Sequence, residues 1–256
     1  MKEHPRHFPA LATAYSYGKA LSTLAMFHFR TKRDAVEHRG DWSFSTAVRL
    51  GEYMRLSSQI PGWARGEEAA ALVAASFALS DSAIIVEIGS FLGSSAVLLA
   101  GARRLKKSGR VHCVDSFDAT GDGVSAPVYR EIRDSLGVSL RRAFDQNLRR
   151  AGLAGWVEVH EGQAVAVAAN WAIPVDMLFL DGDHSHPGVQ AIYHAWIPFL
   201  RIGGLLAVHN SSDRVYEEGH DGSRRLVLGT IHPPRYTGVR CFGSTTFARK
   251  TSDHDA

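Results

Sequence analysis

The sequence has few cysteines, no long apolar run and little excess of either charge. Its two cysteines, Cys113 and Cys241, lie far apart in segments typical of strands, which indicates neither a disulfide framework nor a cysteine metal site. We expect both thiols to be reduced, as in a cytoplasmic protein. No stretch reaches the roughly 18 apolar residues of a membrane-spanning helix, so we expect no membrane span.

The charge balance argues against a nucleic-acid partner. Lys and Arg number 29 and Asp and Glu number 26, which gives a formal net charge of +3. Such a small excess is not the electrostatic footprint of a protein that binds phosphate backbones. The 256 residues, 45% of them hydrophobic, are enough to bury one sizeable core. We therefore expect one main domain and a small-molecule partner.

Apolar segments of strand length alternate with helical segments in most of the chain. The predicted strands are Ile84–Ile88, Val111–Val114, Val157–His160, Met177–Leu180 and Leu205–Val208, followed by two late strands at Arg225–Ile231 and Cys241–Arg249. The predicted helices are Ala69–Leu79, Ser95–Leu105, Ser139–Ala151 and Gly188–Leu200. Alternation of this kind indicates βαβ units, whose right-handed connections place helices on both faces of a parallel sheet.

The first 59 residues are the hardest to place. Pro9–Phe29 is rich in Ala, Leu and aromatic residues, which predicts an amphipathic helix that packs on the domain or on a partner, including a second copy of the chain. Thr31–Arg49 is polar without a sustained period and suits a loop, a short helix or a lid. We divide the chain into an N-terminal helical or lid extension (1–59), a main domain (60–250) and a disordered tail (251–256).

The most informative segment is a glycine-rich turn between the first predicted strand and the next helix. Residues 86–95 read Val-Glu-Ile-Gly-Ser-Phe-Leu-Gly-Ser-Ser, a composition that lets a ligand approach the backbone. The dinucleotide pattern Gly-x-Gly-x-x-Gly and the Walker lysine are both missing, which disfavours pyrophosphate binding. Asp115 ends the next strand, where a carboxylate can accept both hydroxyls of a ribose. Simple packing of the turn and capping by Asp115 are the alternatives.

These features extend to two further motifs, Asp181-Gly182-Asp183-His184 after the fourth strand and Pro198–Gly204 before the fifth. Together they resemble class I S-adenosylmethionine-dependent methyltransferases, most closely the small-molecule O-methyltransferases of the macrocin and catechol type. The similarity covers roughly residues 60–250. It implies a doubly wound α/β fold with a Rossmann-like sheet of seven mostly parallel strands, the last of them antiparallel.

The resemblance also implies which residues contact S-adenosylmethionine. They are Glu87, Gly89, Ser90, Ser94 and Ser95 at or near the methionine part, Asp115 at the ribose, Gln163 and Ala164 at the adenine, and also Ser116 and Asp181. Apart from Glu87, which lies in the first predicted strand, all of them follow predicted strands or lie at the start of the helix after the glycine-rich turn. The carboxyl ends of parallel strands form the ligand-binding edge of such sheets.

Polar residues after the fourth and fifth strands are the candidates for the chemistry. Methyl transfer to an oxygen needs a base or a metal ion that removes or weakens the hydroxyl proton. His184 is the predicted general base, because imidazole titrates near neutrality. Asp181 is a predicted ligand for Mg²⁺ or a similar ion, with His209 and Asn210 completing the set although neither is acidic. Without a metal, His184 and His209 would form the basic site together.

The acceptor pocket is predicted to come from loops outside the sheet. Asp118–Val128 and Ser211–Arg224 are polar, which favours a sugar or a glycosylated metabolite over a flat phenol. We expect most other histidines, including His160 and His220, to be ordinary polar residues of the surface or the core. Two other functions stay open: a non-catalytic cofactor-binding or interaction subunit, and an NAD-linked oxidoreductase, against which the glycine spacing argues.

Overall fold

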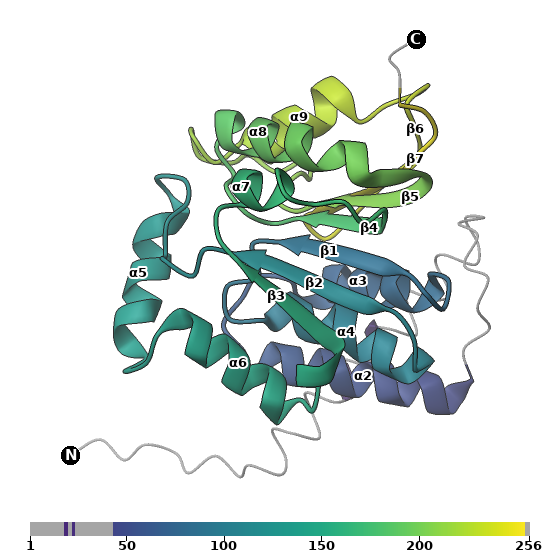
Figure 1. The fold of residues 1–256 in the computed structure, drawn as a ribbon, viewed down its shortest axis with the longest axis vertical. Coiled ribbons are helices and arrows are strands. Elements are labelled where there is room, and N and C mark those ends of the chain that lie inside the picture. The colour runs from purple at the N-terminus through teal and green to yellow at the C-terminus, as the bar shows by residue number, and fades with distance from the viewer. Residues whose placement is uncertain (1–17, 20–21, 24–42, 254–256) are drawn as a thin grey trace.

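The computed structural model describes residues 18–19, 22–23 and 43–253. Its centre is a seven-stranded sheet with the order β3-β2-β1-β4-β5-β7-β6 (Figure 1). Strands β1 to β5 pair in parallel, whereas β7 is antiparallel to both of its neighbours. This topology confirms the predicted doubly wound, mostly parallel sheet whose last strand is antiparallel.

The elements follow the predicted alternation closely. The strands are β1 (Ile84–Ile88), β2 (Arg110–Asp115), β3 (Val157–Glu161), β4 (Val175–Leu180), β5 (Leu200–Val208), β6 (Tyr236–Phe242) and β7 (Thr245–Lys250). The helices are α2 (Phe44–Ser58), α3 (Gly66–Ala78), α4 (Ser94–Lys106), α5 (Ser125–Ser135), α6 (Leu140–Arg150), α7 (Ala164–Ala168), α8 (His186–Trp196) and α9 (Gly222–Thr230). The first five predicted strands and all four predicted helices are confirmed, with ends that differ by a few residues.

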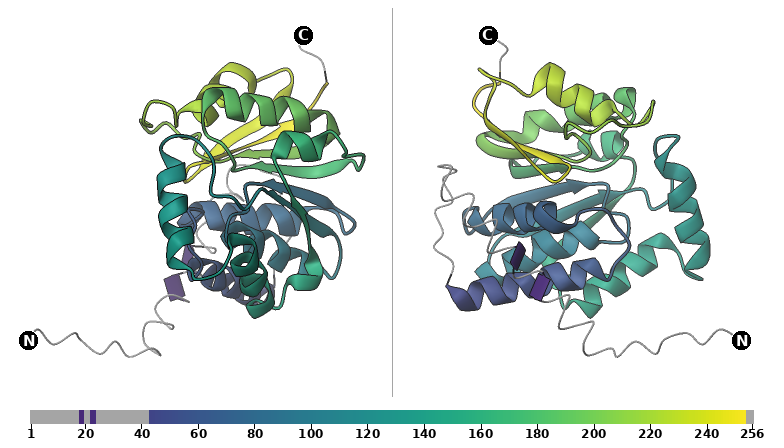
Figure 2. Two further views of the ribbon diagram at one scale, coloured as in Figure 1. Left: turned by 60° about the vertical axis from the view of Figure 1, so that its left-hand side comes forward. Right: turned by 180° about the vertical axis from the view of Figure 1, so that it is seen from behind.

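Helices cover both faces of the sheet (Figure 2), and an apolar cluster lies between the sheet and the helices on each face. Residues of α2, α3, α4 and α6 contribute to one cluster, which includes Leu72, Leu98 and Phe144. In the other cluster, Tyr193 and Trp196 of α8 and Leu226 of α9 pack against residues of the strands. Because both faces are covered, central strands such as β1 are apolar along nearly their whole length. None of the helices in the described part of the chain is long and apolar enough to cross a membrane.

Helix α2 lies on the N-terminal side of the predicted division at residue 60. Its Leu50, Tyr53 and Met54 side chains are buried in the same apolar cluster as α3 and α4. The Tyr53 ring packs directly on Gly101, where a Cβ atom would lie only 2.3 Å from the ring. Residues 44–58 therefore belong to the main core. The predicted helix at Pro9–Phe29, and the interface predicted for it, lie largely outside the described residues.

The two late strands lie elsewhere than predicted. The prediction of a strand at Arg225–Ile231 is wrong, because this segment continues α9. In a strand Leu226 and Leu228 would share one face, but Leu226 is fully buried and Leu228 is 64% exposed, as on a helix. Cys241–Arg249 is a hairpin rather than one strand. Its turn contains Gly243 at φ +64°, a conformation that glycine adopts without strain.

The carboxyl ends of β1 and β4 define the edge at which a ligand is expected. β2 and β3 lie on one side of β1, and the chain then crosses to β4 and β5 on the other side. Ligands of open α/β sheets bind where the connections diverge in this way. Gly89 directly follows β1 and Asp181 directly follows β4, and the Asp181 N–H donates to the Ile88 carbonyl at 2.8 Å.

Candidate active site

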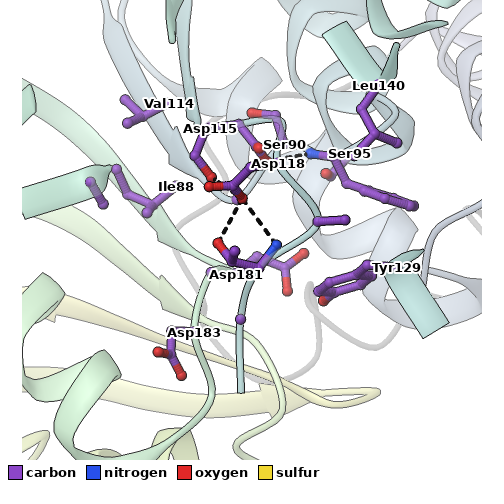
Figure 3. A pocket seen from close by; sticks show the side chains of 18 of the residues that line it. Ile88, Ser90, Ser95, Val114, Asp115, Asp118, Tyr129, Leu140, Asp181 and Asp183 are labelled. Carbon is purple, nitrogen blue, oxygen red and sulfur yellow. Dashed lines mark hydrogen bonds between the residues drawn. The ribbon is translucent and has the colours of Figure 1, made fainter. Parts of the chain in front are cut away.

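A cleft opens at this edge of the sheet, and Figure 3 shows the side chains of Asp115, Asp118 and Asp181 converging on it. Nine of the ten residues predicted to contact the cofactor line this cleft: Gly89, Ser90, Ser94, Ser95, Asp115, Ser116, Gln163, Ala164 and Asp181. They come from the ends of four parallel strands and from the start of α4. The parallel sheet therefore brings together residues that are far apart in the sequence.

Two glycines shape the turn after β1. Gly89 has φ +88°, and a Cβ atom there would lie 2.2 Å from the Asp181 carbonyl oxygen. Gly93 has φ +89° at the start of α4, where a Cβ atom would press on the Phe144 ring at 3.1 Å. Only glycine accommodates both the left-handed backbone and the close approach. The turn consequently presents bare backbone to the cleft, as a cradle for a ligand requires.

Glu87 supports this turn from within the core and does not line the cleft. Its side chain is fully buried, and its carboxylate accepts hydrogen bonds from Ser90 Oγ at 2.7 Å and Cys113 Sγ at 3.2 Å. Burial raises the pKa of this carboxyl group. Glu87 thus fixes the position of Ser90, which does line the cleft.

Asp115 forms the opposite wall at the end of β2. Its two carboxylate oxygens accept the backbone N–H groups of Phe91 and Phe117, each at 2.7 Å. Burial raises the pKa of the Asp115 carboxyl group despite these hydrogen bonds. A carboxylate has about four acceptor positions, so Asp115 can still accept hydroxyl groups from a ligand.

Asp118 is a lining residue that the sequence placed only within a loop. It accepts a hydrogen bond from Ser116 Oγ at 2.7 Å and one from Gln163 Nε2 at 3.3 Å. These contacts tie the loop after β2 to the loop after β3. Asp118 therefore orients the side chain predicted to flank an adenine.

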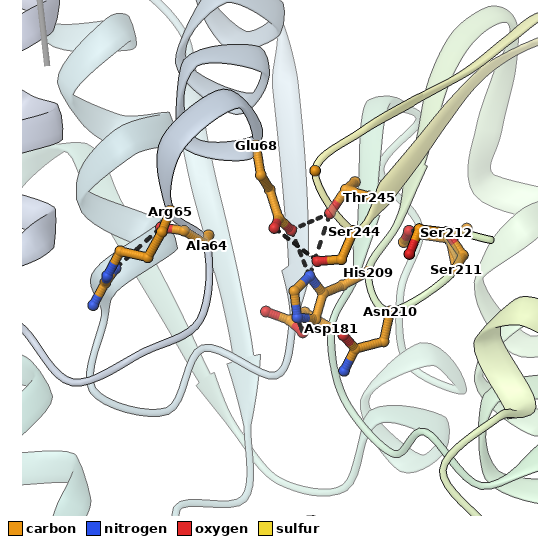
Figure 4. A network of polar contacts seen from close by, with 12 residues as sticks. Ala64, Arg65, Glu68, Asp181, His209, Asn210, Ser211, Ser212, Ser244 and Thr245 are labelled. Atoms are coloured by element: carbon orange, nitrogen blue, oxygen red, sulfur yellow. Dashed lines mark hydrogen bonds and ion pairs between the residues drawn. The ribbon is translucent and has the colours of Figure 1, made fainter. Parts of the chain in front are cut away.

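A buried group of acids and histidines lies on the other side of the cleft, around Asp181 (Figure 4). Asp181 Oδ1 lies 3.7 Å from Nε2 of His184 and also 3.7 Å from Nε2 of His209. Both imidazoles are almost completely buried. The structure thus brings the three predicted catalytic residues together, with Asp181 as the one that lines the cleft.

Glu68 completes this group, and the sequence did not single it out. It projects from the first turn of α3, is only 3% exposed, and accepts hydrogen bonds from His209 Nδ1, Thr245 Oγ1 and, at 2.8 Å, Ser244 Oγ. An acid in a first helical turn is normally explained by the helix dipole. The position of Glu68 in the sequence therefore indicates the start of a helix and gives no sign of a functional site.

The charges of these groups depend on one another. Burial lowers the pKa of His209, but the attraction of the nearby Asp181 and Glu68 carboxylates outweighs this effect and raises the pKa to about 9. Burial raises the pKa of Asp181 to about 7, although the attraction of His209 opposes it. Burial lowers the pKa of His184 to about 3, and the neighbouring His209 adds to this shift. At neutral pH His209 is therefore a buried cation and His184 is a neutral imidazole.

His220, to which the sequence assigned an ordinary role, joins the site from the loop before α9. Its Nδ1 lies 3.1 Å from Asp122 Oδ1, and its Nε2 accepts a hydrogen bond from Asn210 Nδ2 at 3.0 Å. The ring also packs against His184, with centroids 4.8 Å apart. Asp122 and His220 belong to the two loops predicted to form the acceptor pocket, so this contact joins those loops beside His184.

The donor set does not fit a Mg²⁺ site. Mg²⁺ demands octahedral coordination by oxygen ligands, usually including carboxylates and waters. Of the three predicted ligands, only Asp181 offers a carboxylate. His209 Nδ1 is hydrogen-bonded to Glu68, and its Nε2 faces Asp181. The Asn210 amide nitrogen donates a hydrogen bond to His220. We therefore assign no catalytic step to a metal ion.

Strained backbone gathers around the cleft. Five non-glycine residues in the described chain have positive φ, and four of them lie in loops at this edge: Phe91, Phe117, Ala119 and Asn210. Such conformations cost on the order of 1–3 kcal/mol each and cluster at functional sites. Their distribution marks this edge of the sheet as the working part of the molecule.

Three aromatic rings form the outer wall of the cleft. The ring centroids of Trp63, Phe91 and Tyr129 lie 5.0 to 5.9 Å apart, within the range of favourable aromatic pairs. All three residues line the cleft, and Trp63 remains 47% exposed. An apolar platform therefore stands at the entrance, opposite the charged interior.

Known proteins share this architecture. Residues 86–211, which run from β1 to just beyond β5, match a family model described as a methyltransferase domain. The fold is similar to that of a proposed caffeoyl-CoA O-methyltransferase from Staphylococcus aureus, with a TM-score of 0.53, 16% identity, and coverage of 87% of this chain and 99% of that one. It is also similar to a proposed O-methyltransferase from Klebsiella pneumoniae, with a TM-score of 0.50, 19% identity, and coverage of 89% and 97%.

The matched segment identifies residues 86–211 as a methyltransferase domain, and the topology around it is that of the Rossmann-like fold found in O-methyltransferases. An rRNA methylase from Streptococcus thermophilus has a similar fold, with a TM-score of 0.50, 14% identity, and coverage of 75% of this chain and 98% of that one. The acceptor must therefore be argued from the site and not from the fold.

Proposed function

We propose that this enzyme transfers the methyl group of S-adenosylmethionine to a hydroxyl oxygen of a small molecule. The observation that carries the proposal is the position of Asp181, which lines the cleft and is flanked by two buried imidazoles. When bound, S-adenosylmethionine supplies a methyl group on a positively charged sulfur. The acceptor oxygen forms its bond to this carbon as the carbon–sulfur bond breaks, and the hydroxyl proton passes to the protein.

The half of the cleft between β1 and β3 suits the cofactor. Asp115 would accept the ribose hydroxyls, and the loop at Gln163 and Ala164 would flank the adenine. The turn at Gly89 and Ser90, with Ser94 and Ser95 at the start of α4, would take the methionine part. With the cofactor in this position the sulfonium would lie near Asp181, because Gly89 and Asp181 are in direct backbone contact.

Asp181 is the group best placed to receive the proton. A general base works best when its pKa lies near the operating pH, and the pKa of Asp181 is raised to about 7. His184 is neutral, and Ser223 Oγ lies 3.1 Å from its Nδ1 while its Nε2 faces Asp181. In this proposal Asp181 removes the proton, and the neutral imidazole of His184, the base predicted from the sequence, supports Asp181 from behind.

His209 has an electrostatic role in this proposal. As a cation it cannot accept a proton, so it does not act as a base. It faces Asp181 with Nε2 and is held by Glu68 through Nδ1. A preorganised buried charge of this kind stabilises charge that develops nearby during the reaction. Glu68 is then a positioning residue that keeps His209 charged and fixes its ring.

The chemistry around the entrance favours a polyhydroxylated acceptor, a sugar or a glycosylated metabolite. Asp118, Thr120 and Asp183 line the cleft and offer hydrogen-bonding groups. Trp63 and Tyr129 add an apolar surface on which a ring can lie. Ligand sites usually combine such an apolar wall with a few well-placed polar groups.

The test is a methylation assay across matched acceptors. The purified enzyme is incubated with S-adenosylmethionine and either sugars and glycosides or simple phenols, and S-adenosylhomocysteine and the methylated product are followed by mass spectrometry. The proposal expects O-methylated sugar or glycoside. Methylation only at nitrogen, or at no acceptor while the cofactor binds, contradicts the oxygen assignment, and a preference for simple phenols contradicts the acceptor class.

A further inference from the structure

A second cluster of ligand-type side chains lies on β2 and β3, away from the cleft lining. His112 is on β2, and Glu158 and His160 are on β3. The strand register sets His112 directly opposite Glu158, and His160 follows two residues later on the same face of the sheet. In the described chain this is the one group of three such side chains whose ligand atoms all lie within 4.8 Å of one another.

The distances within the cluster are close to those around a single ion. His112 Nδ1 lies 3.0 Å from His160 Nε2, Glu158 Oε2 lies 3.9 Å from His112 Nδ1, and Glu158 Oε1 lies 3.8 Å from His160 Nε2. Two ligands bound at about 2.0–2.1 Å to one ion lie roughly 3 Å apart when their bonds meet at right angles, and farther apart at wider angles. Small side-chain rotations therefore bring all three atoms to coordination distance.

Trp171 holds the two imidazoles in place. Its ring packs edge to face against His112 at 5.0 Å and against His160 at 5.2 Å between centroids. Trp171 in turn packs on Trp196 in the apolar cluster beneath α8. The cluster consequently has a rigid aromatic floor, and its open side is the surface, where the Glu158 side chain is 50% exposed and that of His160 is 25% exposed.

Coordination needs an unprotonated ring nitrogen on each histidine. The two rings share one hydrogen bond, so one of the facing nitrogens carries a hydrogen. When an ion binds, that hydrogen moves to the other nitrogen of the same ring. The ion takes its place, so no net proton is released.

We propose that His112, Glu158 and His160 bind one divalent transition-metal ion, with Zn²⁺ as the type case. Two imidazoles and one carboxylate are a known donor set for zinc, and imidazole ligands favour such borderline ions over Mg²⁺. The exposed side leaves a fourth position for water. This site is separate from the active site and does not depend on the proposed methyl acceptor.

The position of the site links it to the cofactor cleft. His160 is followed by Glu161 and then by the Gly162-Gln163 turn, which lines the cleft. β3 is the edge strand of the sheet and pairs only with β2 among the described strands. An ion that bridges the two strands ties this edge strand down. We therefore expect Zn²⁺ to raise the melting temperature of the enzyme.

The experiment is a titration of the full-length, EDTA-treated and dialysed enzyme with Zn²⁺, followed by calorimetry and by metal analysis after gel filtration. The matched variants are Glu158→Gln, His160→Gln and the two combined, which alter exposed or half-buried side chains and leave the core intact. The site predicts that the wild-type enzyme retains one more Zn²⁺ per chain than the double variant. Each single variant is expected to weaken that binding at least about 10-fold.

A second readout locates the ion. Co²⁺ or Cu²⁺ quenches nearby indole fluorescence, so most of the quenching should disappear in Trp171→Phe and in the double variant. His184→Gln combined with His209→Gln controls for ions at the active site and should keep the quenching and the extra Zn²⁺. Equal Zn²⁺ retention by the wild-type enzyme and the Glu158→Gln, His160→Gln variant overturns the proposal, as does loss of the extra ion in the active-site control alone.

Discussion

The two halves of the cleft are built in different ways. The cofactor half, between β1 and β3, is made of glycines, serines and backbone at strand ends that follow one another along the chain. The half around Asp181 is made of buried charged side chains that come from α3, β4, β5 and the loop before α9. The first depends on backbone shape and the second on electrostatic balance, so the two should respond to mutation in different ways.

The largest effect is expected at the backbone of the cofactor half. Gly89→Ala forces a side chain into a left-handed conformation and within 2.2 Å of the Asp181 carbonyl oxygen. Such a change moves the turn away from β4, and we expect binding of S-adenosylhomocysteine to fall at least about 100-fold. Isothermal titration measures it, with Gly155→Ala as the control because its added Cβ meets no atom within 4 Å. Unchanged affinity in a folded Gly89→Ala protein contradicts the cradle.

A comparably large effect, but on turnover instead of cofactor binding, is expected at Asp181. Asp181→Asn removes the proposed base and keeps its shape, so kcat should fall by about 10²- to 10⁴-fold. The dissociation constant of S-adenosylhomocysteine should change much less, because Asp181 is one of many residues around the cofactor. His184→Gln should cost less than Asp181→Asn. The reverse order of these two losses would return the role of base to His184.

The pairing of Glu68 with His209 should appear as a pH dependence of stability. The pKa of His209 is raised from 6.5 to about 9, so its contribution to stability is complete below about pH 6.5 and is lost as the pH rises through about 9. A shift of this size corresponds to roughly 3 kcal/mol. Glu68→Gln should weaken this dependence, with a larger destabilisation at about pH 6.5 than at about pH 9. Urea unfolding at several pH values tests this, and parallel curves for both proteins contradict the pairing.

The smallest effect is expected from removal of divalent cations. The donor set around Asp181 does not suit Mg²⁺. EDTA should therefore change the rate of methyl transfer by less than about twofold, and added Mg²⁺ should not raise it. Steady-state rates before and after chelation measure this directly. Loss of activity with EDTA and recovery with Mg²⁺ contradict the metal-free mechanism.

The same contrast explains how much could be predicted from the sequence. The strand-to-helix turn at Gly89 and the acid Asp115 are local signals, because spacing along the chain fixes where they lie relative to the strands. The first five strands were predictable for the same reason. The hairpin of β6 and β7 was misplaced because the short apolar run in α9 has the length of a strand, and only tertiary contact with α8 decides its conformation.

The electrostatic half could be predicted only in part. Asp181, His184 and His209 follow strands and were found by position, but their charges depend on partners from remote segments. Glu68 lies outside residues 86–211, in a helix whose first turn explains an acid without any site. His220 is brought to His184 by a loop of irregular structure. Burial and pairing in space set these pKa values, and neither is visible in a linear pattern.

Calorimetric titration of S-adenosylhomocysteine into the wild-type enzyme and into Asp115→Ala tests the central claim most directly, because that claim places the adenosyl group between the glycine turn and the end of β2. The account predicts saturable binding with one site per chain for the wild-type enzyme, and at least about 10-fold weaker binding for the variant. Folded wild-type enzyme that shows no saturable binding, or a variant that binds as tightly as the wild type, would contradict it.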